Sequence, residues 1–419
     1  MKKFYIKTLG CKVNQYDSAK LKNILISYGF SYNIENPDYI IINTCAVTKV
    51  AIKKDWQIWQ NLKNKFPLAK IILIGCWPKI YKSEKFKKAD LVIADKDLKK
   101  IAQKISQINK NKNKKEKENI LKVDDKSRYF LKIADGCNQF CSYCIIPFSR
   151  GRLSSVKKEE IIAEAKAALD YGYNEIVLTA IHLGAYGKDF KSSSKYTLFH
   201  LLKDLLKETK NVRYRLSSIE VNEVNSQLID LIANSKGRIC QNLHIPLQSG
   251  SDKILKLMKR PYNTNFFQKK IDNIKSKIPK VAINTDLIVG FPGENNEDFI
   301  KTYNLAKELA FSKIHVFPFS EHELAAASKF KNQVKAQEKK ERSKLLRDLS
   351  DQLANHFKAK ILSALKSLTV LIEKKEGSIY IARSEFYFLI KFKFKNKKTT
   401  NILVGKLLNV KLKEIEIII

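Results

Sequence analysis

Three short apolar segments near the start of the chain alternate with amphipathic stretches. The segments FYIKTLGC, DYIIINTC and KIILIGC are rich in β-branched and aromatic residues, and each ends at a cysteine. Residues 17–28 and 48–66 have the apolar spacing of helices, ADLVIAD predicts a fourth strand, and residues 96–108 predict another helix. Strands that alternate with helices predict a parallel, doubly wound sheet over residues 1–108.

The cysteines that end these three segments are Cys11, Cys45 and Cys76. Ligands of such sheets bind at the carboxyl ends of the strands, so we expect the three thiols to come together at one edge. The alternative for each of them is an ordinary core position, because a free cysteine packs as a small hydrophobic residue.

A second series of strands follows a charged, low-complexity linker at residues 109–126. Six segments between residues 127 and 330 predict strands, and amphipathic stretches separate them: YFLKIADG, NEIVLTAI, VRYRLSSIE, ICQNLHIPLQ, VAINTDLIVG and KIHVFPFS. Six strand–helix units predict a partial parallel barrel of the TIM type, with its site at the carboxyl ends of the strands.

The remainder of the chain predicts one long helix and a small β-structure. Residues 331–365 carry leucines on a single stripe, which is typical of a packed connecting helix. Residues 366–419 show short alternating segments with turns and predict a small β-barrel. The expected fold class is therefore α/β, with a doubly wound parallel N-terminal domain, a partial (βα)6 barrel and a small C-terminal β-barrel.

The segment DGCNQFCSYCIIPFSRG follows the first barrel strand and contains Cys137, Cys141 and Cys144. A closed zinc site needs four ligands, and so does an iron–sulfur cluster that is held by protein alone. Three thiolates can hold three irons of a cubane cluster and leave the fourth iron open to a non-protein ligand. The alternative is a zinc site that a distant fourth ligand completes.

Charge and composition narrow the class of protein. The chain has 419 residues and a formal net charge of +37, so it attracts polyanions, although drift towards Lys, Asn and Ile explains the charge equally well. No apolar run is long enough for a membrane span, and Lys7 interrupts the apolar start, which argues against export. Patterned cysteines in a cytoplasmic chain indicate metal binding rather than disulfides.

The CxxxCxxC loop on a partial barrel resembles the radical S-adenosylmethionine (SAM) enzymes. The resemblance implies a 4Fe-4S cluster on Cys137, Cys141 and Cys144, whose open iron is chelated by SAM. In that family one electron from the cluster cleaves SAM to a 5′-deoxyadenosyl radical. Tyr143 corresponds to the aromatic residue that the family places against the adenine of SAM.

Further segments resemble the methylthiotransferases within that superfamily and cover nearly the whole chain. They are NTCAVT, GCNQFCSYCIIPFSRGR, EIVLTAIHLGAYGKD, RYRLSSIE, HIPLQSGSDKILKLMKRPY and TDLIVGFPGENNEDF. The resemblance implies a second 4Fe-4S cluster on Cys11, Cys45 and Cys76, whose open iron holds the sulfur that is transferred. It also implies tRNA as the substrate, carbon 2 of an adenosine beside the anticodon as the target, and an electron donor such as flavodoxin or ferredoxin.

NTCAVT, AIHLGAYGKD and HVFPFS most resemble the branch that acts on N6-threonylcarbamoyladenosine in tRNA. Other branches act on isopentenyladenosine in tRNA or on an aspartate of a ribosomal protein. The segment EHELAAAS departs from the pattern at His322, Leu324 and Ala325, where an arginine and a Gly-Thr pair are expected. Hypotheses of a different class are an iron–sulfur protein that binds RNA without catalysis and a two-cluster electron carrier.

Polar residues at the ends of the barrel strands are candidate cofactor contacts. Arg215, Ser217 and Glu220 end the third strand, and Gln248 and Ser249 follow the fourth. We expect these five side chains to contact SAM. The histidines His182, His244 and His315 lie in or after barrel strands, where a lone histidine is more often structural.

The C-terminal segment resembles the small RNA-binding β-barrel of this family, called TRAM. Lys391, Lys393 and Lys395 alternate with Phe392 and Phe394, so the lysines share one face of the strand and the aromatic rings the other. We expect the lysines to contact RNA phosphates and the phenylalanines to form core.

Overall fold

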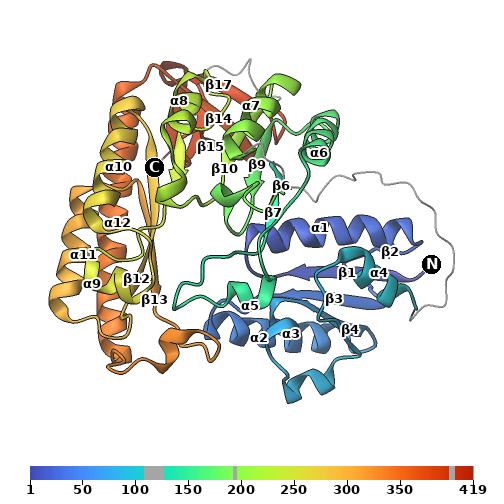
Figure 1. Ribbon diagram of the computed structural model, residues 1–419. Coiled ribbons are helices and arrows are strands. Elements are labelled where there is room, and N and C mark those ends of the chain that lie inside the picture. The colour runs from blue at the N-terminus through green and yellow to red at the C-terminus, as the bar shows by residue number, and fades with distance from the viewer. Residues whose placement is uncertain (108–126, 192–195, 396–401, 419) are drawn as a thin grey trace.

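The computed structural model describes residues 1–107, 127–191, 196–395 and 402–418, so the expected linker at 109–126 lies outside the described residues. The described chain forms an N-terminal sheet, an open barrel of parallel strands and a C-terminal antiparallel sheet (Figure 1). Within these residues no helix is both long enough and apolar enough to cross a membrane.

The N-terminal sheet is parallel and has the strand order β2-β1-β3-β4-β5. Its strands are β1 (Lys3–Thr8), β2 (Ser31–Tyr32), β3 (Tyr39–Thr44), β4 (Lys70–Gly75) and β5 (Leu91–Val92). Its helices are α1 (Lys12–Ser27), α2 (Lys49–Lys65), α3 (Cys76–Ile80), η1 (Glu84–Lys88) and α4 (Leu98–Gln107).

Helices cover both faces of this sheet. Leu21 of α1 and Ile101 of α4 pack against Ile41 on one face, whereas Trp59 of α2 packs against Ile40 on the other. Every residue of β3 is buried, as a strand covered on both sides requires. The predicted doubly wound sheet is therefore confirmed.

Helix α1 begins at Lys12 and not near residue 17, where the apolar spacing placed it. The first turns of α1 contain Asn14 and Asp17, which are buried although they are polar. Both bond to Arg150 of the barrel, so this face of the helix is an interface between domains. Hydrophobic periodicity missed the start of the helix because polar contacts replace apolar ones there.

Six parallel strands form the open barrel: β6 (Tyr129–Lys132), β9 (Glu175–Thr179), β10 (Arg213–Leu216), β11 (Asn242–His244), β12 (Ala282–Val289) and β13 (Lys313–Pro318). They form the ladders β10-β9-β6 and β11-β12-β13. Isolated parallel bridges, Tyr214 with Ile239 and Ser218 with His244, join the two ladders between β10 and β11. The predicted partial barrel of six strands is confirmed.

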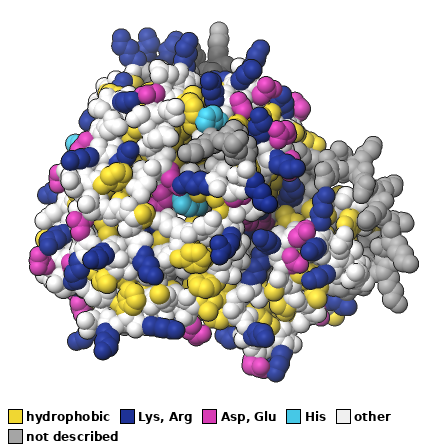
Figure 2. All heavy atoms as spheres, in the orientation of Figure 1, with side chains coloured by type: hydrophobic (Ala, Val, Ile, Leu, Met, Phe, Trp, Pro, Cys, Tyr) yellow, Lys and Arg dark blue, Asp and Glu magenta, His cyan; other side chains and the backbone are white. Residues whose placement is uncertain are grey.

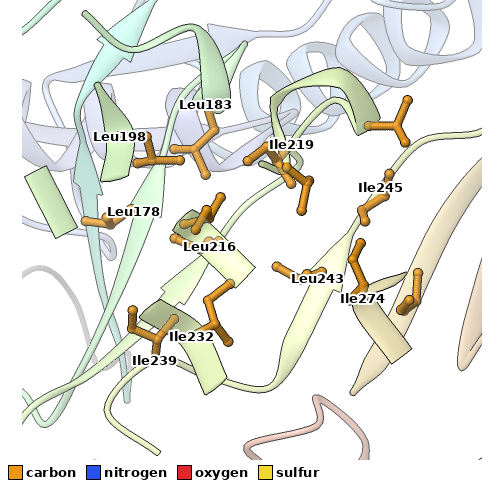
Figure 3. Close-up of a cluster of buried hydrophobic side chains, with 14 of the residues drawn as sticks. Leu178, Leu183, Leu198, Leu216, Ile219, Ile232, Ile239, Leu243, Ile245 and Ile274 are labelled. Carbon is orange, nitrogen blue, oxygen red and sulfur yellow. The ribbon is translucent and has the colours of Figure 1, made fainter. Parts of the chain in front are cut away.

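Helices cover the outer face of the barrel: α6 (Lys158–Asp170), α7 (Leu198–Glu208), α8 (Ser226–Asn234), α9 (Asp252–Leu257), α10 (Thr264–Lys277) and α11 (Asn296–Glu308). Leu178, Leu216 and Leu243 point from the strands into this helical layer, as Figure 3 shows. Side chains alternate along a strand, so neighbours such as Arg215 and His244 face the interior of the barrel. That interior is lined by polar side chains.

Short elements surround the cysteine loop and the other loops at the carboxyl ends of the strands. They are β7 (Ala134–Asp135), α5 (Ile146–Arg150), β8 (Ser154–Ser155), η2 (Leu183–Ala185), η3 (Val221–Glu223) and η4 (Ala326–Lys329). Figure 1 shows α5 between the N-terminal sheet and the barrel. The loop of the second cysteine set therefore lies at the junction of the two domains.

The long helix α12 (Ala336–Ala364) leads from the barrel to the C-terminal sheet. The strands are β14 (Ser367–Glu376), β15 (Ile379–Ser384), β16 (Leu389–Phe394), β17 (Leu407–Lys411) and β18 (Ile415–Ile418), with η6 (Leu412–Glu414) between the last two. They form a curled antiparallel sheet in the order β17-β14-β15-β16-β18. Among the described residues no ladder joins β17 to β18, so the predicted small barrel is a half-barrel.

Strand β16 has the two faces that its sequence predicts. Phe392 is fully buried in the core of the half-barrel, and Phe394 packs against that core. Lys391 and Lys395 are exposed, and Lys393 forms an ion pair with Glu416 (3.1 Å) at the surface. The aromatic rings are therefore core, and the row of lysines is available to solvent.

Candidate active site

The loop that carries Cys137, Cys141 and Cys144 runs from β7 to α5 and folds back on itself. The backbone N–H of Cys137 donates to Gly151 O (3.1 Å), and that of Cys144 donates to Cys141 O (3.0 Å). Gly136 has φ +71°, and a Cβ there would lie 2.1 Å from the carbonyl oxygen of Arg152. Only glycine fits this turn, which directs three thiols to the carboxyl end of the barrel.

Nitrogen donors surround two of these sulfur atoms. His182 Nδ1 lies 3.4 Å from Cys137 Sγ, and the backbone N–H of Gln139 donates to the same sulfur at 3.3 Å. Arg260 Nη1 donates to Cys141 Sγ at 3.3 Å. Donors of this kind stabilise a thiolate more than a thiol. They therefore favour the deprotonated form of these cysteines, which is the form that binds metal.

Burial has the opposite effect on the free thiols. It raises the pKa of Cys144 to about 12, with smaller contributions from Cys141 and Cys137. Burial also raises the pKa of Cys141, although Arg260 opposes that rise. Since a coordinating cysteine is deprotonated by its metal, we expect binding at this loop to release protons.

Cys137, Cys141 and Cys144 give this loop three candidate ligands, the number that a cubane cluster with one open iron requires. Among the residues that the structure describes, no group of three His, Cys, Asp or Glu side chains is arranged to hold a single metal ion.

A cavity of about 350 Å³ opens beside this loop. Its lining includes Asn138, Gln139, His182, Lys188, Glu220 and Glu223. Figure 2 shows one face of the molecule, with acidic side chains and a histidine beside basic side chains near its middle. Lys and Arg side chains are spread over the rest of that face. The volume is in the range of sites for small-molecule ligands, and the polar groups can fix a ligand's orientation.

His182 connects the cysteine loop to the wall of the cavity. Its Nε2 lies 2.9 Å from Glu223, which also accepts from Lys188 at 2.7 Å. Burial opposes a charge on this ring, but hydrogen bonds to Cys137 and Glu223 outweigh burial and raise the pKa of His182 to about 10. From the sequence, His182 was expected to be a structural histidine at the end of a strand. Nothing in its own segment indicates the contact with Cys137.

Glu220 and Tyr143 meet at one arginine. Arg260 forms an ion pair with Glu220 and donates to Tyr143 Oη at 3.4 Å. The guanidinium lies 5.0 Å from the centroid of the Tyr262 ring, whose hydroxyl bonds to the backbone of residues 246 and 247. Arg260 belongs to the segment HIPLQSGSDKILKLMKRPY, but its contact with the cysteine loop was not predicted, because only the folded chain brings the two together.

The other candidate cofactor contacts lie in different surroundings. Ser217 Oγ is buried, and no described residue gives it a hydrogen-bond partner. Gln248 has φ +68° and bonds through its backbone to Asp286 and Ile288. Ser249 bonds to Thr302 of α11 (3.3 Å), so its hydroxyl faces the helical layer.

Arg215 is not brought to the cysteine loop. Its guanidinium donates to Glu175 (3.0 Å) and to the carbonyl oxygen of Ser384 in the C-terminal half-barrel (3.0 Å). Arg213 binds the same carboxylate, and neighbouring arginines hold the pKa of Glu175 near 2 although burial opposes its charge. Arg215 therefore joins the half-barrel to the barrel and lies away from the cavity beside the cysteine loop.

The structure brings Cys11, Cys45 and Cys76 together at one edge of the N-terminal sheet. They follow the neighbouring strands β1, β3 and β4. Cys11 is the N-cap of α1, and Cys76 is the first residue of α3. A Cβ on Gly10 would lie 3.1 Å from Cys45 Sγ, so the backbone beside Cys11 passes close to Cys45. Burial, with smaller contributions from Cys76 and Cys11, raises the pKa of Cys45 to about 12.

Asp55 of α2 fixes the position of Cys45. Its carboxylate accepts the backbone N–H of Cys45 at 2.8 Å, and the side chain is 2% exposed. Burial raises the pKa of Asp55 to about 7. A buried carboxylate beside one of three converging thiols was not predicted, since its partner is a backbone group that no sequence pattern identifies.

Arg150 links the two sets of cysteines. It ends α5 next to the cysteine loop, donates to Asp17 of α1 (2.7 Å) and to Asp135 (3.1 Å), and bonds to Asn14. Its charge also acts on Cys11, opposing the rise in the pKa of that thiol that burial causes. One guanidinium therefore holds the start of α1 against the loop of the other set.

A second contact between the domains involves the segment that departs from the family pattern. His322 is 1% exposed, donates to or accepts from the hydroxyl of Tyr81 (3.0 Å), and bonds to Ala46 O, directly after Cys45 (3.0 Å). Ala325 is buried in the core of the N-terminal domain. His322 and Ala325 thus form an interface beside the N-terminal cysteines, whereas Leu324 is exposed.

An open six-stranded barrel with three cysteines in the first loop defines the radical SAM class. The model of the Radical SAM superfamily matches residues 131–306, and that of the Uncharacterized protein family UPF0004 matches residues 3–95. The chain is 35% identical to the threonylcarbamoyladenosine tRNA methylthiotransferase MtaB of Bacillus subtilis, over 97% of this chain and 92% of that protein. The chain therefore belongs to the methylthiotransferase family of radical SAM enzymes, and membership implies a 4Fe-4S cluster and SAM as cofactors.

Two further comparisons describe the range of the similarity. The chain is 33% identical to the tRNA-2-methylthio-N(6)-dimethylallyladenosine synthase of Thermoanaerobacter pseudethanolicus, over 98% of this chain and 90% of that protein. Its fold is similar to that of the radical SAM methyltransferase TsrM from Kitasatospora setae, with a TM-score of 0.54 and 12% identity over 76% of this chain and 73% of that one. The likeness to TsrM concerns the fold alone.

Proposed function

We propose that this enzyme methylthiolates carbon 2 of N6-threonylcarbamoyladenosine next to the anticodon of tRNA and forms the 2-methylthio derivative. The observation that carries the proposal is the junction at Arg150, which joins the loop of one set of three cysteines to the helix that follows Cys11 of the other set. The similarity to the MtaB protein of Bacillus subtilis supports the choice of substrate.

The target is a C–H bond on an aromatic ring, and no side-chain acid or base removes such a hydrogen readily. When bound, a 4Fe-4S cluster and SAM supply the electron and the carbon radical that this chemistry requires. Cys137, Cys141 and Cys144 hold the cluster, and Arg260 and His182 donate hydrogen bonds to two of the three sulfurs.

SAM occupies the cavity beside the cysteine loop. Glu220, which lines the cavity, provides a polar contact, and Tyr143 directly precedes Cys144 in the loop. A ligand that fills this cavity also excludes water from the reacting atoms, which protects a radical from side reactions.

Cys11, Cys45 and Cys76 would hold a second 4Fe-4S cluster, which would supply the sulfur for the transfer. The chemistry of the donor set supports this assignment, because three thiolates again leave one iron without a protein ligand. Asp55 and Arg150 position the segments that carry these cysteines. A further SAM provides the methyl group.

The substrate RNA binds along the positively charged surface. The lysine row of Lys391, Lys393 and Lys395 on the half-barrel contacts phosphates, and flavodoxin or ferredoxin delivers electrons. The enzyme works in the cytoplasm, where tRNA is modified.

The test is mass spectrometry of nucleosides from tRNA that has been incubated with the enzyme, SAM and a reductant. One tRNA carries N6-threonylcarbamoyladenosine and a second carries isopentenyladenosine. We expect the 2-methylthio product from the first alone. A product from the second alone would assign the chain to the isopentenyladenosine branch. A product from neither would contradict tRNA methylthiolation and leave the ribosomal-protein branch or RNA binding without catalysis.

A further inference from the structure

The interior of the open barrel is polar and reached by water. His244 Nε2 lies 2.9 Å from Asp286 Oδ1, and the His244 ring stacks on His315 with centroids 5.3 Å apart. The side chains of His244 and Asp286 keep 21% and 24% of their exposure, and Phe317 on the same face of β13 is 46% exposed. Closed barrels fill their interior with packed side chains, so this interior has room for part of a substrate.

Lys12 projects from the N-terminal domain towards this interior. It is the first residue of α1 and directly follows Cys11. Its ammonium lies 5.9 Å from the centroid of the Tyr387 ring and interacts electrostatically with Tyr387, Arg128 and Arg215. Its charge also acts on His315, so the ammonium belongs to the same polar interior.

The neighbouring arginines all have carboxylate partners. Arg215 binds Glu175 (3.0 Å), and Arg128 binds Glu373 (2.7 Å). Arg383, whose guanidinium also lies over the Tyr387 ring, binds Glu373 as well. These contacts hold the half-barrel on the barrel.

Lys12 differs from these arginines. Across residues 1–107, 127–191, 196–395 and 402–418 it forms neither a hydrogen bond nor an ion pair. The half-buried ammonium is attracted by Glu175, but that carboxylate is already bound by Arg213 and Arg215, so positive charge is in excess around Lys12. Burying a cation without a direct counter-ion is unfavourable. The site therefore suits an anionic group that arrives with a ligand.

We propose that Lys12 binds the carboxylate of the threonylcarbamoyl group of the substrate and selects this nucleoside over isopentenyladenosine. The inference rests on the proposed function and adds the residue that recognises the substrate. Carbon 2 and carbon 6 of adenine both flank N1, and carbon 6 carries the N6 substituent. A base whose carbon 2 faces the cysteine set of Cys11 therefore presents its N6 substituent to the same neighbourhood. The isopentenyl group carries no charge and would leave the ammonium without a partner.

An RNA phosphate offers the same oxyanion chemistry, and the two sources differ in position. Phosphates lie on the outside of a nucleic acid and meet the exposed lysines of the surface. Lys12 instead directly follows Cys11, and its ammonium lies near the Tyr387 ring. The base has to approach Cys11 for carbon 2 to receive sulfur. We therefore assign the carboxylate of the modified base to Lys12.

The test uses the variant Lys12→Met in the full-length holoenzyme. Its dissociation constant is measured without SAM for two forms of one tRNA, with N6-threonylcarbamoyladenosine or with unmodified adenosine beside the anticodon. Loss of a charge-assisted contact should weaken binding of the modified form on the order of 10- to 100-fold. Binding of the unmodified form and the iron content should stay as in the parent enzyme.

Two further variants complete the design. Lys20→Met removes the same charge from the same helix at a side chain that is 49% exposed, and it should leave the ratio of the two dissociation constants unchanged. Lys12→Arg keeps the charge and should retain most of the preference for the modified tRNA. Both variants separate recognition of the base from general attraction of RNA.

Three results would overturn the assignment. Equal loss of affinity for both forms of tRNA would mean that Lys12 contacts a phosphate. Loss of iron would mean that its charge balances a cluster at Cys11, and an unchanged preference would mean that another residue reads the carboxylate. The nucleoside analysis of the parent enzyme separates the two proposals, because a parent that acts on isopentenyladenosine alone contradicts the proposed function itself.

Discussion

The two sets of cysteines lie in two domains that Arg150 joins, but the chain builds them in different ways. Cys137, Cys141 and Cys144 come from a single loop, and backbone hydrogen bonds within that loop fix their positions. Cys11, Cys45 and Cys76 come from the ends of separate strands, and only the parallel sheet brings them together. The first set therefore depends on local geometry and the second on the fold of a whole domain.

The surroundings of the two sets differ in the same way. Side-chain nitrogens of His182 and Arg260 contact sulfurs of the loop set. In the strand-end set a buried carboxylate, Asp55, holds the backbone of Cys45. Donors that point at sulfur tune the electronic properties of a metal site, whereas a contact to the backbone fixes its geometry.

The largest effect is expected from Cys141→Ala. This change removes one of three ligands from the loop set, so SAM cleavage should be lost and the iron content should fall by about half. The strand-end set should keep its cluster. Production of 5′-deoxyadenosine, measured by chromatography after addition of a reductant, checks the result.

The matched control is Cys240→Ala. Cys240 is the cysteine outside both sets, and it is 1% exposed in the core of the barrel. Its loss should leave the iron content and SAM cleavage unchanged. Equal iron loss in the two variants would mean that Cys141 is only a core thiol.

Arg150→Met should have the next largest effect, because Arg150 joins the two sets. The side chain is 3% exposed, and its removal leaves Asp17 and Asp135 with fewer partners. Breaking a buried ion pair from one side lowers the free energy of unfolding by about 3–5 kcal/mol. Denaturation with urea checks the loss of stability.

The double variant Arg150→Met with Asp17→Asn supplies the control for charge. Asp17 also pairs with Lys132 (2.6 Å), so recovery of stability should be partial. We further expect Arg150→Met to reduce methylthio transfer more than SAM cleavage, since only the transfer requires a fixed relative position of the two cysteine sets. Equal losses of the two activities would contradict a bridging role.

The smallest effect concerns the lysine row on the half-barrel. Replacement of Lys391, Lys393 and Lys395 by glutamine should lower the slope of log affinity for tRNA against log salt by at most about 0.9 per phosphate contact. Deletion of the half-barrel is less informative, because it would leave Arg213 and Arg215 without the backbone partners that they have there.

A triple glutamine variant of exposed lysines on other elements serves as the comparison: Lys256, Lys269 and Lys340. It removes the same charge, so a purely general attraction would predict the same change in slope. An effect confined to the row on β16 supports direct phosphate contacts. Titration of tRNA across several salt concentrations provides both slopes.

The sequence predicted those parts of the molecule that follow from periodicity and spacing. Buried strands such as β3 and the six strands of the barrel have continuous apolar signals, and the cysteines stand at fixed offsets from them. The fold class and the position of both cysteine sets could therefore be derived before the structure. The similarity to a known family added the chemistry.

What the sequence could not predict are the contacts between distant segments. Arg260 contacts Cys141 although the two residues lie far apart in the sequence. Arg215 was expected to contact the cofactor but pairs with Glu175 and the half-barrel. His322 departs from the family pattern but packs on Tyr81 between two domains. Such pairs leave no periodic signal because each partner is a single polar residue whose neighbours give no indication of it.

We propose that the loop set of cysteines serves SAM cleavage and that the strand-end set serves sulfur transfer. The most direct test of these separate roles is the variant Cys45→Ala, with both products measured in one sample. The parent enzyme and the variant are incubated with SAM, a reductant and tRNA that carries N6-threonylcarbamoyladenosine, and mass spectrometry quantifies 5′-deoxyadenosine and the 2-methylthio nucleoside. We predict both products from the parent and 5′-deoxyadenosine alone from Cys45→Ala, because the loop set of cysteines is untouched. Formation of the 2-methylthio nucleoside by Cys45→Ala at the parent's rate would contradict a role of the strand-end set in sulfur transfer.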